Sequence, residues 1–218
     1  MGSIAPDFEY FFRMRTGSVI SHTLPGVLVF DVPVAVLLAF VFHGIVRDPL
    51  LNNLPRPLQM RLRQPWSLDF PWYFRQHRSR FLVSAALGAL SHLSWDALTH
   101  NGWAAQNLSV YRNWHLQLGD ADYPLFYVLQ QLSTVLGSAA VAWFVWRLPA
   151  TEPTVIGEKR RSFWPMVVTV TIGVSAVRLF GDFANAGLGD VVITLIASTL
   201  IGLITTGWWL YRRQMADT

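Results

Sequence analysis

The chain has 218 residues, of which 52% are hydrophobic and only 14% are charged. A soluble domain normally carries about 25% charged residues, so this composition argues against a soluble protein and indicates an integral membrane protein. The net charge of +4 would suit nucleic-acid binding in a soluble chain, but the lysines and arginines lie between apolar runs, so we expect no nucleic-acid partner. The absence of cysteine excludes disulfides and thiolate ligands.

Five apolar runs are each long enough to cross about 30 Å of hydrocarbon at about 1.5 Å per residue. They cover approximately residues 27–46, 81–98, 123–146, 163–180 and 191–211. These runs predict an all-α fold, a polytopic transmembrane helical bundle that forms a single integral membrane domain over residues 1–218. Membrane lipids are therefore its expected surroundings. The oligomeric state does not follow from the pattern.

The loops between the spans differ in charge. Lysines and arginines concentrate in residues 47–80, in 147–161 and in the tail, whereas the alternate loops carry Arg13, Arg15 and Arg112. The positive-inside rule predicts that the first set is cytoplasmic in a bacterial inner membrane. The C-terminus would then be cytoplasmic, residues 47–80 a basic cytoplasmic loop interrupted by prolines, and residues 1–26 an outer-face segment.

The first residues, MGSIAPD, resemble the end of a helix that enters a turn. We therefore expect a further apolar helix to precede this sequence, which would give six spans.

The second run carries a stripe of ionisable residues, His92, Asp96 and His100. Residues four apart lie on one face of a helix, and ionisable residues within a membrane usually mark a functional site. The predicted orientation brings this stripe toward the outer face, because the helix runs outward from Arg80. The N-terminal segment brings Asp7, Glu9 and His22 to the same side.

These two groups contain enough donors for a divalent metal, of which zinc is the first choice, or for two ions that share a carboxylate. The predicted metal ligands are Asp7, Glu9, His22, His92 and Asp96. His100 is a further ligand candidate or a general acid/base, and Asp31 would orient a ligand histidine through its second nitrogen. A hydroxide generated at the metal would attack an ester or phosphoester of a lipid or envelope molecule.

Each candidate also has a simpler interpretation. Asp7 could be a helix cap, Glu9 a solvated side chain and His22 a loop residue. His43 and His77 are expected to be structural, and His115 and Asp120 lie in an outer loop without informative spacing.

Two non-catalytic alternatives remain open. The ionisable stripe could line a transport path or hold a structural metal, although a transport site is expected near the middle of the membrane. In a structural or partner-binding protein, the carboxylates would instead form salt bridges with nearby arginines: Arg13, Arg15, Arg112 or Arg178.

The segments APDFEYF (residues 5–11), SHTLPG (21–26) and FDVP (30–33) resemble the bacterial membrane proteins grouped as domain of unknown function 4184 (DUF4184). The stretch from Ser91 to Gly102 is more distantly similar to inner-membrane metal-dependent hydrolases of the YdjM type. That resemblance implies a metal site at Asp7 and Glu9, at His22, and at His92 and Asp96.

The sequence departs from the resembling families at two places. Those families usually begin with a further helix that contains a histidine, which this sequence does not supply. The His-Arg-Gly that precedes the Thr-His segment in the broader group is also absent, because Gly17 and Ser18 occupy that region. His100 stands where that group often has proline.

Overall fold

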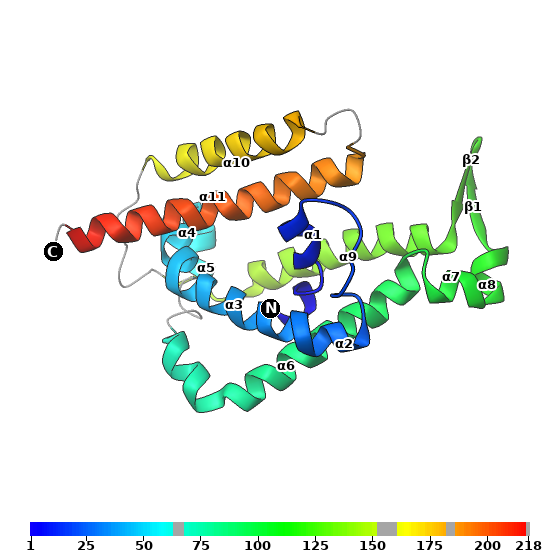
Figure 1. Ribbon diagram of the computed structural model, residues 1–218, viewed down its shortest axis with the longest axis horizontal. Coiled ribbons are helices and arrows are strands. Elements are labelled where there is room, and N and C mark those ends of the chain that lie inside the picture. Colours follow the sequence, from blue (N-terminus) through cyan, green and yellow to red (C-terminus); the bar gives the residue numbers. More distant parts are fainter. Residues whose placement is uncertain (63–67, 152–160, 182–185, 217–218) are drawn as a thin grey trace.

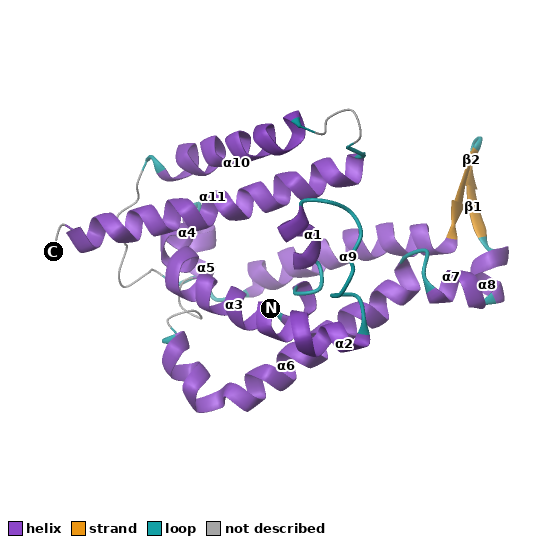
Figure 2. Cartoon of the chain, in the orientation of Figure 1, coloured by secondary structure: helices purple, strands orange, loops and turns teal. Residues whose placement is uncertain are grey.

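The computed structural model describes residues 1–62, 68–151, 161–181 and 186–216. Helices dominate this part of the chain, and a single two-stranded hairpin accompanies them there (Figure 2). Five helical segments are long and apolar enough to span a membrane: Leu24–Asn53, Phe70–Asn107, Leu125–Arg147, Phe163–Phe180 and Leu188–Arg213. The predicted all-α bundle with five spans is therefore confirmed.

The first span is one continuous helical path made of α2 (Leu24–Gly26), α3 (Val32–Val41) and α4 (Arg47–Asn53). Two π-helical turns, Val27–Asp31 and Phe42–Val46, join these pieces. The expected end at residue 46 is wrong, because the helix continues past Pro49. A proline inside an α-helix clashes with the carbonyl four residues earlier. For both Pro33 and Pro49 that carbonyl lies in a π turn, whose wider backbone accommodates the proline ring.

The predicted basic loop 47–80 is also largely helical. It contains α4, α5 (Arg56–Leu62) and the start of α6 (Phe70–Thr99), while residues 63–67 lie outside the described residues. The second span thus begins eleven residues before the predicted position 81. The Asp69 side chain caps α6 by accepting a hydrogen bond from the Trp72 amide at 3.0 Å, and Pro71 is tolerated in the first turn. A kink at His77 redirects the helix.

Short helices α7 (Trp103–Asn107) and α8 (Ser109–Asn113) lead from α6 into a hairpin that the sequence pattern did not predict. Its strands, β1 (His115–Leu118) and β2 (Ala121–Pro124), pair antiparallel, with Leu118 opposite Ala121. The third span was expected to start at residue 123, but α9 covers Leu125–Arg147 because the first two residues belong to β2. No described residue of α9 is buried.

The last two spans, α10 (Phe163–Phe180) and α11 (Leu188–Ala216), form a closely packed pair (Figure 1). The predicted bounds of α10 agree with the structure, and α11 extends beyond the predicted 191–211 at both ends. A Cβ atom on Gly202 would lie 2.8 Å from the Val167 carbonyl oxygen, so this glycine permits the close approach. Small residues commonly have this role between membrane helices.

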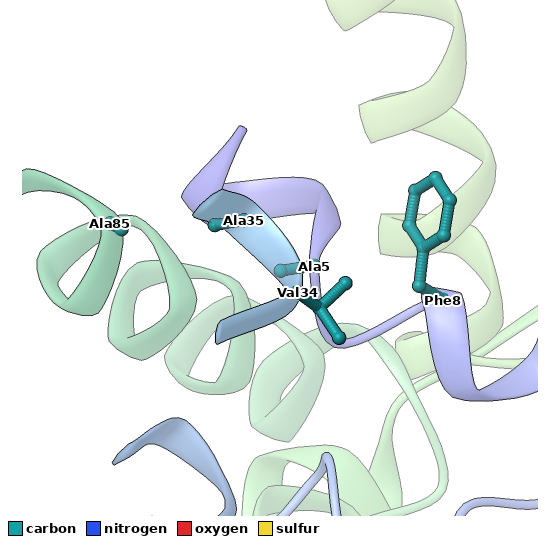
Figure 3. Packing of buried hydrophobic residues seen from close by; sticks show 5 residues of the cluster. All are labelled: Ala5, Phe8, Val34, Ala35 and Ala85. Atoms are coloured by element: carbon teal, nitrogen blue, oxygen red, sulfur yellow. The ribbon is translucent and has the colours of Figure 1, made fainter. Parts of the chain in front are cut away.

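The N-terminal segment enters the bundle. A 3-10 turn, Gly2–Ile4, packs against α6 so closely that a side chain on Gly2 would collide with the Ala85 backbone. Ala5 lies next to Val34 and Ala35 of α3, and together they face Ala85 (Figure 3). Small side chains therefore let these first residues pack between helices, while the assignment of residues 1–26 to the outer face stays a prediction. Helix α1 (Phe8–Arg13) follows.

The bundle has two distinct ends. At the end that we call the basic end, the Arg61 guanidinium lies 4.4 Å from the centre of the Trp146 ring, and the Trp164 indole donates a hydrogen bond to the Asn53 carbonyl at 2.9 Å. The C-terminal part of α11, with Arg212 and Arg213, lies at this end. The last turns of α6, the start of α11 and the hairpin lie at the opposite end (Figure 1).

Candidate metal centre

The stripe on α6 forms as its spacing predicts. His92 Nε2 lies 3.3 Å from Asp96 Oδ2, and the other carboxylate oxygen of Asp96 lies 3.5 Å from His100 Nδ1. Both contacts join residues four apart on the last turns of α6, opposite the basic end. One carboxylate therefore stands between two histidines.

Two further donors come from the N-terminal segment. Asp7, just before α1, has Oδ1 3.5 Å from His92 Nε2. His22, in the loop before the first span, has Nε2 3.4 Å from Asp96 Oδ2 and 4.0 Å from Asp7 Oδ1. The imidazole rings of His22 and His92 have their centres 5.5 Å apart. Three separate parts of the chain thus bring four donor atoms together.

These separations suit ligands of a common ion better than direct hydrogen bonds. A charge-assisted N–H···O bond is about 2.7–2.9 Å long, which is shorter than every separation in the group. Two ligands bound at about 2.0–2.2 Å with a tetrahedral angle lie about 3.4 Å apart. In addition, His92 Nε2 is buried without a hydrogen-bond partner in the described part of the chain. The donor set therefore fits a divalent metal.

The donors border a cavity of about 580 Å³. Its lining combines ionisable, hydroxyl and apolar side chains: Asp7, Tyr10, Ser18, His22, Leu24, His92, Leu93, Asp96, Ala97, His100 and Gly102. The side chains of His22 and His92 are only 17% and 15% exposed, whereas that of His100 is 51% exposed. The two histidines therefore lie deeper than His100, whereas the side chains of Asp7 and Asp96 are 37% and 24% exposed.

Two unpredicted residues support His22. The Tyr10 hydroxyl lies 3.4 Å from His22 Nε2, and the Ser21 hydroxyl lies 2.9 Å from His22 Nδ1. Burial and the nearby carboxylates of Asp7 and Asp96 raise the pKa of Tyr10, so it remains a neutral phenol. Tyr10 follows Asp7 by three residues, and this spacing could have indicated that both share a face. Ser21 gave no comparable signal.

Asp31 does not have the predicted role for His22, because Ser21 occupies His22 Nδ1. Asp31 is fully buried at the end of the first π turn, and it is absent from the cavity lining. Both of its carboxylate oxygens are buried without a hydrogen-bond partner among the described residues. A direct catalytic contact between Asp31 and a substrate in the cavity is therefore not supported.

Glu9 points away from the cluster, contrary to the prediction that it is a metal ligand. Its carboxylate accepts hydrogen bonds from three backbone amides, those of Val19, Ile20 and Ser21, at 2.7, 3.0 and 2.8 Å. Burial raises the pKa of Glu9, but these hydrogen bonds outweigh that effect and lower it to about 2. Arg13 lies 3.5 Å from the same carboxylate.

His100 ends α6 and lines the cavity, as expected for a proton carrier. Its Nε2 lies 3.2 Å from the side-chain amide nitrogen of Gln130 on α9. Gln130 was not predicted, although a glutamine within an apolar span is a recognisable signal.

The other ionisable candidates lie apart from this cavity. His43 stacks on Phe70 at 4.8 Å, and the His77 ring lies 5.0 Å from that of Tyr73. His115 pairs with Asp122 at 2.9 Å across the hairpin. Asp120 is in the turn of that hairpin and does not line the cavity. The alternative of arginine-paired carboxylates applies to Glu9, whereas Asp7 and Asp96 face histidines.

A family model described as Domain of unknown function (DUF4184) matches residues 1–208. Searches of curated proteins and of solved structures found no match.

Proposed function

Because the chain belongs to the DUF4184 family, whose description states no activity, we propose a function from the cavity itself: that of a membrane-embedded, metal-dependent hydrolase. The proposed substrate is an ester or phosphoester of a lipid or envelope molecule. The proposed cofactor is a divalent metal, with zinc first, held by Asp7, His22, His92 and Asp96.

One observation carries the proposal. Two imidazole nitrogens and two carboxylate oxygens, delivered by three separate segments, converge at ligand-to-ligand distances beside a cavity. Imidazole and carboxylate together suit zinc, manganese and iron. A structural zinc site is closed by four protein ligands, whereas a catalytic site uses about three and keeps a position for water or substrate. Three of the donor atoms, those of Asp7, His22 and His92, all lie within 4.8 Å of one another, so these three could hold the ion while Asp96 leaves a position open. The cavity beside the donors favours the catalytic alternative.

A divalent ion bound there would polarise a substrate oxygen and lower the pKa of a water molecule. The chain itself supplies the proton transfers. His100 faces Asp96 through Nδ1 and lines the cavity, so we assign this histidine as the proton carrier for the leaving group. Tyr10, as a neutral phenol beside His22, can hydrogen-bond a substrate oxygen.

The proposed location is a bacterial inner membrane with a cytoplasmic C-terminus. The arginines at the basic end support this orientation through the positive-inside rule. The cavity would then open near the outer face. Its lining includes Leu24, Leu93 and Ala97 beside the ionisable groups, and such a mixture suits an amphiphilic substrate.

The first test is elemental analysis of the detergent-purified protein, with His92→Ala beside it. The proposal expects near-stoichiometric zinc or manganese in the natural chain and its loss from the variant, while both elute as folded protein. A natural chain that binds neither metal would refute it. With metal present, hydrolysis of chromogenic phosphoesters and carboxyl esters, lost in His100→Ala, would separate an enzyme from a structural metal site or a transporter.

A further inference from the structure

Glu9 is a buried carboxylate that the proposed reaction does not use. It lies on α1 only two residues after Asp7, yet it faces the opposite way. Its two oxygens are surrounded by the amides of consecutive residues Val19, Ile20 and Ser21. A carboxylate that accepts several backbone N–H bonds is held in place far more firmly than one that faces solvent.

The bonded amides belong to the loop that carries His22. Thr23 joins this loop to the helix that follows. Its hydroxyl donates a hydrogen bond to the Ile20 carbonyl at 2.7 Å and accepts one from the Gly26 amide at 3.0 Å. That second bond caps the start of the first span. The loop is thus fixed on one side by Glu9 and on the other by the helix that follows.

The link from Glu9 to the metal donors passes through Ser21. Its amide donates to Glu9 and its hydroxyl lies 2.9 Å from His22 Nδ1, and the residue is fully buried. The partner of Nδ1 determines which way an imidazole ring turns and which nitrogen is available for a metal. His22 Nε2 is left facing Asp96 and Asp7.

We infer that Glu9 is a positioning residue, which sets the direction of His22 through the amides of residues 19–21 and the Ser21 hydroxyl. This inference rests on the proposed function as far as metal affinity is concerned. The position of His22 relative to His92 can be tested without a metal. Glu9 touches neither ion nor substrate in this assignment.

The first experiment is zinc titration against a competing chelator, with natural protein, Glu9→Gln, His22→Ala and the double variant. Loss of a residue that orients a metal ligand typically weakens binding about 10–100-fold, and we expect that loss for Glu9→Gln. Because Glu9 acts through His22, Glu9→Gln should add nothing in the His22→Ala background. Additive losses would instead make Glu9 a ligand in its own right and overturn the inference.

Asp190→Asn is the matched control. Asp190 also holds this part of the chain, since it accepts bonds from the Thr16 amide and hydroxyl at 2.7 and 2.9 Å. It anchors the loop six residues before His22 and has no bond to Ser21 or His22 among its described contacts. We expect zinc affinity within twofold of natural protein. An equal loss in both variants would indicate general loosening and overturn the inference.

The second experiment needs no metal. The chain has no cysteine, so His22→Cys with His92→Cys gives one thiol pair for a short bifunctional reagent. The two rings have their centres 5.5 Å apart, and the pair should therefore cross-link readily. Because the His22→Cys side chain lacks the imidazole that Ser21 contacts, this pair reports how the amides of residues 19–21 place residue 22. Adding Glu9→Gln should slow the cross-linking, whereas an unchanged rate would show that Glu9 does not place residue 22 and would overturn the inference. If the natural chain binds no zinc, the proposed function fails and this rate alone decides the role of Glu9.

Discussion

Replacing Asp96 by asparagine gives the sharpest test of the proposed metal centre. Asp96 Oδ2 lies 3.4 Å from His22 Nε2 and 3.3 Å from His92 Nε2, so it is one of four converging donors. Four-ligand zinc sites in small peptides bind with about 10–16 kcal/mol. An equal share is about 2.5–4 kcal/mol per donor, which corresponds to a loss of about 10²–10³ in affinity.

The assay is zinc titration of Asp96→Asn in detergent, with unfolding followed by tryptophan fluorescence. Asp122→Asn is the control, because Asp122 forms a direct 2.9 Å pair with His115 in the exposed hairpin, outside the cavity. We expect full zinc affinity in the control. Equal zinc affinity in Asp96→Asn and natural protein would refute the assignment of these four residues as ligands.

Three further predictions concern packing, pH and topology. Gly202→Val should destabilise the protein by about 1–3 kcal/mol through overpacking against Val167. The control Gly137→Val, whose added Cβ meets nothing within 4 Å in the described chain, should unfold like natural protein. Equal unfolding midpoints for the two variants would contradict the close α10–α11 contact. Because folding lowers the pKa of Glu9 from 4.5 to about 2, its stabilisation is complete above pH 4.5 and is lost toward pH 2. The gap in unfolding temperature between natural protein and Glu9→Gln should therefore shrink over that range, and a constant gap would argue against a charged Glu9. Finally, Asp120→Cys should react with an impermeant maleimide in intact cells and Arg213→Cys only after lysis; the reverse would invert the proposed orientation.

Sequence periodicity predicted the spans because membrane helices need long apolar runs, and α10 shows this most clearly. It failed at the start of α6, where Phe70–Arg80 is aromatic and basic rather than apolar and only the Asp69 cap and Pro71 signalled a helix. The predicted end of the first span at residue 46 was wrong because the π turn Phe42–Val46 lets the helix continue past Pro49. The hairpin was missed because its strands are only four residues long.

For the site, helical spacing correctly placed His92, Asp96 and His100 on one face. The same geometry shows why Asp7 and Glu9 could not both be ligands. Residues two apart on a helix point about 200° from each other, so one faces the cavity while the other meets the loop. Spacing carries no information on the partners of Glu9, which are backbone amides ten to twelve residues away.

The docking of the N-terminal segment inside the bundle would give a bound ion a mechanical role. An ion that joins Asp7 to His92 would close a loop of about 85 residues, which the chain-entropy model for cross-links values at roughly 3–5 kcal/mol. In a chain without cysteine, such an ion would take the place of a disulfide staple. Chelators would then release the N-terminal segment to proteases, and the availability of metal would control how long the protein survives as well as its chemistry.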